Sequence, residues 1–235
     1  MDFIVDEAVW RMFPGLRLVV VVGNGLDNRE RRPAVEEDLA IAQHQLKENW
    51  KYPKPQSHPF IAVWRDAFKV ARVSGKQFPS SIEALARRVL SGKSLAGINP
   101  LVDFYNAVSL RYLVPAGGWD LQDISGSCLL LKLTRVGEPF TELGTTDPVH
   151  VNAGEVSYMD NTEVLTRHFV WRQAETGKIE PKTTYFFLVS EILSAVGPDI
   201  ASAVERAVRE GMRKYFAVKA RTAILDSTVS HWTLD

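Results

Sequence analysis

The chain has 235 residues, 46% of them hydrophobic and 24% charged, so it can bury a core, and its composition excludes an intrinsically disordered protein. Its 28 basic side chains are balanced by 28 acidic ones, which excludes a strongly basic nucleic-acid-binding protein. The one cysteine, Cys128, excludes an intramolecular disulfide framework. No apolar run reaches membrane-spanning length, and the acidic N-terminal segment is unlike a signal peptide, so we expect a cytoplasmic protein without a membrane partner.

The first expected element is a buried strand over Leu16–Val22, rich in valine. Gly23 and Gly25 follow it, as in a dinucleotide-binding loop, but Asn28 replaces the third glycine of that fingerprint. A tight turn into a helix is sufficient to explain the two glycines. Pro33 suits the first turn of that helix, and apolar residues continue at helical spacing to residue 46.

Three more helices are expected before the middle of the chain. Apolar residues at helical spacing predict one over residues 61–71, ending near Gly75. Ser80 and Glu83 form a capping-box pair that opens the next helix, which closes at Gly92. The third helix is capped by Asn99 and extends over residues 100–112.

The pattern then changes from helical to strand-like. Residues 129–133 alternate between apolar and polar side chains, and the further strand candidates are Glu155–Asp160, Val164–Trp171 and Thr183–Val189. A last helix starts at Pro198. Helices first, strands in the middle and a helix last predict one α+β domain and not a βαβ repeat.

The basic residues are unevenly distributed despite the zero net charge. Residues 60–93 hold seven basic residues against two acidic ones, and residues 203–221 hold six against two. Solvated helix faces explain each segment alone. Two such segments in one chain also suit a partner with a phosphate backbone.

Most sequence motifs for catalysis are absent. The five histidines lack metal-ligand spacing, so we expect no metal and no cofactor. No serine or cysteine lies in a nucleophile motif. Any chemistry must therefore depend on hydrogen-bonding groups around a cleft.

The first such group lies on one side of the expected helix at residues 100–112. Asp103, Asn106 and Ser109 are spaced three apart there. A solvated polar stripe is the simpler interpretation. However, asparagine and serine are poor choices for an exposed helix surface, which favours a functional role.

Two further groups follow along the chain. Gly117 and Gly118, followed by Asp120, form either a simple turn or a backbone that exposes N–H donors. Trp171–Gln173 combine an indole, a guanidinium and an amide, which together can stack on a base and bind phosphate or carbonyl oxygens. A structural tryptophan at a sheet end is the competing interpretation.

These residues carry a resemblance to a known family, the tRNA-editing (B3/B4) domain of the phenylalanyl-tRNA synthetase β-subunit. Asn99–Asn106 resembles its Pro-x-Val-Asp-x-Thr-Asn helix, and Val114–Asp120 resembles its Gly-Gln-Pro-x-His-x-Phe-Asp loop. Gly137–Glu138 is similar to its Gly-Glu turn, and Thr183–Val189 to its closing strand. The resemblance covers about 90 residues between Asn99 and Glu191, with weaker likeness back to residue 80.

The resemblance implies a B3/B4-type fold with a central β-sheet or β-sandwich core flanked by helices. It implies one domain over residues 1–235. Within that domain we expect a recognisable core at about 80–191, an N-terminal strand–helix extension at 1–79 and a C-terminal helix at 198–220.

The resemblance also implies a function, namely hydrolysis of the ester of a mischarged tRNA. The tRNA would present its aminoacylated 3′ end, Asn106, Gly117 and Gly118 would be catalytic, and six residues would bind substrate. Those six are Tyr105, Ser109, Asp120, Trp171, Arg172 and Gln173. Ester hydrolysis there needs an oriented water and donors for the oxyanion, and no side-chain nucleophile.

The sequence departs from the family pattern at three positions. Tyr105 replaces a threonine, and Gly117 replaces the loop histidine. The family's closing-strand glutamate corresponds to Val189, unless Glu191 shifts into its place. The alternative hypothesis is therefore a non-catalytic module that keeps the fold and binds RNA or a small ligand. A third is an unrelated enzyme on this fold.

Overall fold

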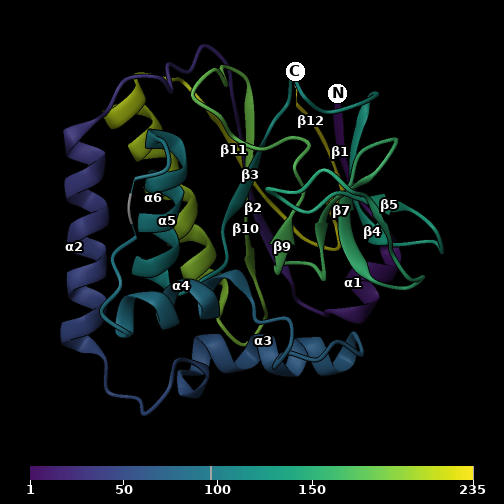
Figure 1. Cartoon of the computed structure of the whole chain (residues 1–235), viewed down its shortest axis with the longest axis horizontal. Helices are drawn as coiled ribbons and strands as arrows, with labels where there is room; N and C mark the ends of the chain where they lie inside the picture. Colours follow the sequence, from purple (N-terminus) through teal and green to yellow (C-terminus); the bar gives the residue numbers. More distant parts are fainter. Residues whose placement is uncertain (96, 235) are drawn as a thin grey trace.

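Two β-sheets that face each other form the centre of the molecule, and helices cover the outer face of one of them (Figure 1). The structure is a computed structural model that describes residues 1–95 and 97–234. Its mixed sheets and flanking helices confirm the predicted α+β class.

The larger sheet has six strands. Their order is β12 (His231–Thr233), β1 (Asp2–Val5), β4 (Cys128–Leu133), β7 (Val156–Met159), β8 (Val164–Arg167) and β9 (Arg172–Gln173). β1 and β4 are parallel and the other neighbours are antiparallel. A separate pair, β5 (Pro139–Phe140) and β6 (Val149–His150), lies beside this sheet.

The smaller sheet is antiparallel throughout. Its order is β11 (Arg221–Leu225), β2 (Arg17–Gly23), β10 (Phe186–Ile192) and β3 (Gly117–Asp120). The segment expected as an N-terminal extension thus supplies an inner strand to each sheet, β1 and β2. No strand was predicted from the sequence at β1, β3, β5, β6, β11 or β12.

The helices are named in chain order. They are α1 (Glu7–Met12), α2 (Pro33–Asn49), the 3-10 turn η1 (Pro55–Ser57), α3 (Pro59–Val70), α4 (Ser81–Leu90), α5 (Pro100–Tyr112) and α6 (Pro198–Phe216). Figure 1 shows α5 and α6 beside the smaller sheet, with α2 outside them.

Strand alternation in β10 explains the layering. Phe187 and Val189 point toward the larger sheet, where the Phe187 ring lies 5.0 Å from that of Phe3. Phe186 and Leu188 point the other way and pack with apolar residues of α5 and α6. Fully burying each such side chain contributes roughly 1.5–3 kcal/mol, so both faces of β10 stabilise the fold.

Two of the expected strands have wrong bounds. The strand expected over Val164–Trp171 ends at Arg167, because His168 and Phe169 adopt left-handed backbone angles, with φ of 47° and 64°. The closing strand begins at Phe186, three residues later than expected. The Thr183 hydroxyl instead donates to the Asp120 carboxylate at 2.7 Å, in the turn before the strand.

Two helix ends also differ from expectation. The helix expected over residues 61–71 ends at Val70, and Arg72 follows with a φ of 57°. At the start of α4, Ser80 Oγ accepts from the Glu83 N–H as a capping box requires. The Glu83 carboxylate, however, binds Arg65 and Arg87 and so contributes no second half to that capping box.

Candidate functional site

A cavity of about 760 Å³ opens where the two sheets meet beneath α4 and α5. Its walls come from the N-terminal half of α5, from β3 and β10 of the smaller sheet, and from residues 169–173 beside the larger sheet. Trp119, Tyr158 and Phe169 make the interior largely aromatic. The cavity is large enough for an aromatic or nucleoside-sized ligand.

The structure brings most of the residues proposed from the sequence into this one cavity. Those that line it are Tyr105, Asn106, Gly117, Gly118, Trp171, Arg172 and Gln173. They come from α5, from β3 and from β9 with the residue before it, segments that are far apart in the sequence.

Asn106 presents a polar group to an otherwise apolar wall. The residue is 8% exposed, and within residues 1–95 and 97–234 its side-chain amide has no hydrogen-bond partner. A buried amide without a partner costs roughly 1–3 kcal/mol. An amide that lines a cavity can instead bind water or a ligand, so Asn106 can donate to a carbonyl oxygen and accept from a water there.

The two cavity glycines differ in what their backbone offers. β3 is the last strand of its sheet and pairs with β10 on one side. On the other side, the Gly118 carbonyl accepts from Gln173 Nε2 at 2.9 Å, and the Asp120 N–H donates to the Gly177 carbonyl at 2.9 Å. Because N–H and C=O of one residue point to the same side and alternate along a strand, the Gly118 N–H faces this open edge. The Gly117 N–H faces β10 and belongs to the ladder, so this strand does not present a pair of adjacent donors.

The two glycines also differ in the space around them. A Cβ at Gly118 would lie 2.4 Å from Leu188 Cδ2 and 2.8 Å from the Phe187 carbonyl oxygen, so a side chain there would clash. A Cβ at Gly117 would meet no atom of the described residues within 4 Å. The position where the family carries its histidine is therefore open toward the cavity and can accept a side chain.

Glu191 is the acidic group of the cavity. It lies on the face of β10 that points toward the larger sheet, and it is 4% exposed. The Tyr158 hydroxyl donates to its carboxylate at 2.7 Å. Burial raises the pKa of Glu191 to about 7, although the hydrogen bond from Tyr158 opposes the shift. Burial also raises the pKa of Tyr158 well above its ordinary value, and the nearby Glu191 adds to that effect.

Glu191 is the alternative counterpart of the family's closing-strand glutamate. The resemblance in sequence matched that glutamate with Val189 unless Glu191 shifts into its place. Both Val189 and Glu191 line the cavity, since they are two residues apart on one strand face. Glu191 thus supplies a carboxylate within the cavity. One of its oxygens already accepts a hydrogen bond from the protein's own Tyr158 hydroxyl. Tyr158 and Trp119 complete this wall, and neither was among the site residues predicted from the sequence.

Tyr105 lines the same wall at the position of the family's threonine. Burial raises the pKa of the Tyr105 hydroxyl far above its ordinary value, and the charge of Asp103 adds to the shift. The phenol is therefore neutral at physiological pH and can serve only as a hydrogen-bonding and packing group.

The group at residues 171–173 lies at the mouth of the cavity. Arg172 is exposed and pairs with Glu142 at 3.2 Å, and its guanidinium lies 5.5 Å from the centre of the Trp171 ring. The Gln173 side-chain amide donates its hydrogen bond to the Gly118 carbonyl oxygen. Trp171 is half-buried, and its ring packs edge to face with that of Phe78, with ring centres 4.6 Å apart.

Two of the proposed substrate-binding residues lie outside the cavity lining. The buried Ser109 hydroxyl donates to the Val114 carbonyl at 2.5 Å, where it fastens the end of α5. The Asp120 carboxylate is buried and accepts from the Thr183 hydroxyl and from the Gln122 N–H at 3.0 Å. Both side chains hold the ends of elements that line the cavity, and neither lines the cavity itself.

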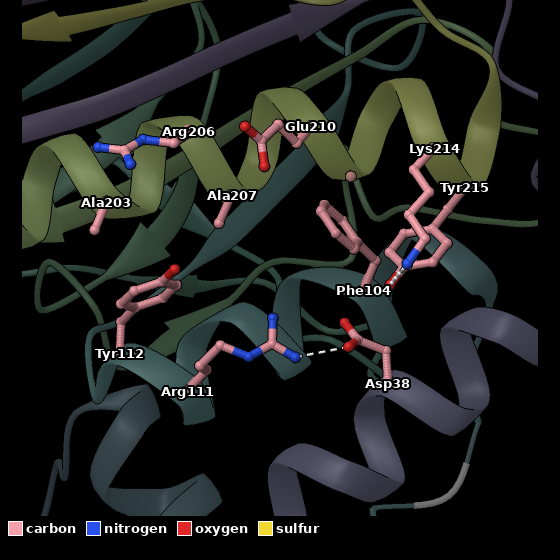
Figure 2. Close-up of a pocket in the computed structure, with 11 residues that line it drawn as sticks. Asp38, Phe104, Arg111, Tyr112, Ala203, Arg206, Ala207, Glu210, Lys214 and Tyr215 are labelled. Atoms are coloured by element: carbon pink, nitrogen blue, oxygen red, sulfur yellow. Dashed lines mark hydrogen bonds and ion pairs between the residues drawn. The ribbon is translucent and has the colours of Figure 1, made fainter.

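A second, smaller cavity of about 300 Å³ lies between α2, α5 and α6. Figure 2 shows Arg111 reaching Asp38 across it, at 2.6 Å, and Lys214 against Tyr215. Arg206 and Glu210 face it from α6. Its polar side chains are arranged as a solvated groove between helices.

The described residues show neither a candidate metal site nor a candidate membrane span. Within them, no group of three His, Cys, Asp or Glu side chains is placed to hold a metal ion. Among the helices described, none is both long and apolar enough to cross a membrane. Cys128, the one cysteine, is a free thiol.

Comparison with known proteins gives three findings. The model of the B3/4 domain family matches residues 64–224, more than half of the chain. A solved N-terminal fragment of the phenylalanyl-tRNA synthetase β-subunit from Pyrococcus horikoshii is similar at 15% identity with a TM-score of 0.44; the match covers 93% of this chain and 50% of that one, so this chain spans half the length of that relative. Curated proteins yield no match. From the extent of the family match, the chain belongs to the B3/4 domain family.

Proposed function

We propose that the cavity binds the aminoacylated 3′ end of a tRNA and hydrolyses the ester that links the amino acid to the terminal ribose. The observation that carries this proposal is the pairing of two unused hydrogen-bonding groups in one cavity. The Asn106 amide and the Gly118 N–H both border it, and they come from the two segments that resemble the family's editing helix and loop.

In this reaction, water attacks the ester carbonyl carbon, and the carbonyl oxygen becomes an oxyanion. When the oxyanion collapses, the bond from the carbonyl carbon to the ribose oxygen breaks. The proton lost by the attacking water passes to that ribose oxygen, so the products are the free amino acid and the tRNA with a free terminal hydroxyl. Asn106 orients the water or the carbonyl oxygen, and the Gly118 N–H donates to the oxyanion. Such donors are typically worth roughly 100- to 1,000-fold in rate. The aromatic side chains of the interior receive the amino-acid side chain or the terminal base.

A rival function is supported by a specific residue. Gly117 stands where the family carries a histidine, so this chain lacks that imidazole. A cavity without it suits a module that binds an aminoacyl-tRNA, or a smaller ligand with the same chemistry, and does not hydrolyse it.

A deacylation screen over a panel of correctly and wrongly charged tRNAs, carried out in EDTA, separates the two functions. The proposal expects accelerated hydrolysis of at least one charged tRNA without added metal. Gly117→His is the companion variant: because the position is open, it should fold normally and raise the rate on the same substrate. Saturable binding of charged tRNA with no acceleration, in both proteins, would favour the binding module.

A further inference from the structure

The mouth of the cavity carries basic side chains from the end of one helix. Arg87 and Arg88 lie in the last turn of α4, and Lys93 follows just beyond it. All three line the cavity and all three are exposed. The sequence identified residues 60–93 as a basic segment, explained by a solvated helix face or by a phosphate-backbone partner. Its spacing did not place these side chains beside the polar residues of α5.

The positive charge at this end of α4 is only partly neutralised. Glu83 is shared by Arg65 and Arg87, so one carboxylate serves two guanidinium groups. Arg88 donates through Nε to the Ser94 carbonyl oxygen at 3.2 Å, which leaves its terminal nitrogens unused within the described chain. Lys93 has no acidic partner among the described residues. Of the three basic side chains in the lining, Arg87 shares its carboxylate with Arg65, and Arg88 and Lys93 have no acidic partner among the described residues.

The neighbouring side chains suit the other parts of a nucleotide. The indole of Trp171 lies at the mouth, and Ile98 and Leu143 line it while 68% and 45% exposed. Flat or apolar surface next to uncompensated cations is the pattern that binds bases and phosphates together. Glu191, by contrast, is buried within the cavity and is the one carboxylate in the described lining.

We infer that Arg88 and Lys93, with Arg87 beside them, bind the phosphate on the 5′ oxygen of the terminal nucleoside while that nucleoside enters the cavity. This rests on the proposed function for what occupies the interior. It adds the direction of entry, since the chain of the RNA would leave the cavity across the end of α4.

The test uses three ligands that carry an amino acid, the one on the tRNA hydrolysed fastest in the deacylation screen. It is linked through a stable amide instead of an ester. The first is 3′-aminoacylamino-adenosine, the second is its 5′-monophosphate, and the third carries cytidine through a 5′ phosphodiester. Hydrogen bonds to charged groups contribute about 1.5–3 kcal/mol, so the phosphate should tighten Kd about 10- to 100-fold in the wild-type protein. In the double variant Arg88→Ala, Lys93→Ala the gain should fall below about 3-fold, with unchanged affinity for the ligand without phosphate.

The control is Lys69→Ala with Lys76→Ala, which removes two exposed charges outside the cavity lining. It should retain the phosphate gain. Wild-type protein that binds the nucleoside but gains nothing from phosphate would overturn the inference and leave the proposed function standing. A gain confined to the cytidine ligand and untouched by the double variant would also overturn it, because the base would then be the group recognised. Failure of all three ligands to bind would contradict the proposed function itself.

Discussion

At the scale of single residues, Glu191 gives the cavity a pH dependence of stability. Its pKa is raised from 4.5 to about 7 in the folded state, so between these pH values the unfolded chain releases a proton that the folded protein keeps. Stability is therefore lost as pH rises from 4.5 to 7 and is constant above. Glu191→Gln removes this loss, and its stability relative to wild type should grow by up to about 3 kcal/mol across that range.

Urea unfolding at several pH values measures this difference. Tyr158→Phe is the matched variant, because it keeps the carboxyl group but removes the hydrogen bond that lowers the pKa of Glu191. Its stability loss should continue to a higher pH than in the wild type. A difference between Glu191→Gln and wild type that stays flat with pH would show that the carboxyl group is not buried as described.

The two cavity glycines make a second prediction at this scale. Gly118→Ala should lower the free energy of unfolding by roughly 1–3 kcal/mol, because its methyl group would press on Leu188 and on the β10 backbone. Gly117→Ala should change it by less than about 0.5 kcal/mol, since that position is open. Thermal or denaturant melts of the two variants decide it, and equal losses in both would be inconsistent with the strand register described for β3.

Some site residues could be predicted from the sequence and others could not, and the difference lies in whether their contacts are local or between distant segments. Asn106 could be selected because asparagine is a poor choice for an exposed helix surface and because it matches the asparagine of the family's helix motif. Ser109 lies three residues further along the same side of the helix, yet its hydroxyl donates to the Val114 carbonyl just after the end of α5. Glu191 and Tyr158 meet across 33 residues from different sheets, and no local pattern predicts such a contact.

At the scale of elements, α5 is fixed at its start by two asparagines. Asn28 donates to Asn99 Oδ1 at 3.0 Å and to the Glu180 carbonyl at 2.8 Å, and it accepts from the Leu101 N–H at 2.9 Å. Asn28, which replaces the third glycine of the dinucleotide-binding fingerprint, therefore helps to cap the helix that carries Asn106. All of these groups are buried or partly buried.

Replacing Asn28 with Ala should cost roughly 1–3 kcal/mol of stability, because three hydrogen bonds to buried or partly buried groups are lost. Asn24→Ala, in the same loop, changes an exposed side chain that bonds only its neighbour Gly25 among the described residues, and it should have little effect. Chemical denaturation compares them. Similar melts for both variants would mean that the network does not hold α5.

Long elements with a regular spacing of apolar residues could be predicted from the sequence, and short strands could not. α2, α4, α5 and α6 have apolar residues at helical spacing, and β2 is a run of valines. β3 is the sequence Gly-Gly-Trp-Asp, whose glycines indicate a turn; it is a strand because β10 provides a partner along its whole length. β11 and β12 likewise depend on partners from the N-terminal third of the chain.

At the scale of the whole molecule, zero net charge conceals a second basic surface on α6. Arg206, Arg209 and Arg213 are exposed on one side of this helix. Arg209 pairs with Glu205 at 3.0 Å, whereas Arg206 and Arg213 have no ion pair with any described residue. Arg206 borders the groove in Figure 2. If tRNA is the partner, this surface can contact its phosphate backbone.

Changing these three arginines to Ala together should weaken tRNA binding and reduce the slope of log affinity against log salt by about 2–3. Lys47, Lys51 and Lys54, all exposed, provide a control triple on another part of the surface. Filter binding or anisotropy between low and physiological salt measures both. Affinity that does not vary with salt, or an equal loss in the control, would contradict a backbone contact by α6.

The most direct test of the central claim is single-turnover hydrolysis of a charged tRNA by Asn106→Ala, with affinity and melting temperature measured on the same protein. Asn106 is expected to orient the water or the carbonyl, so the rate should fall roughly 100- to 1,000-fold. Affinity should change little, and the fold should be retained because the amide has no partner in the described protein. An unchanged rate, or a loss of rate in proportion to unfolded protein, would contradict the account.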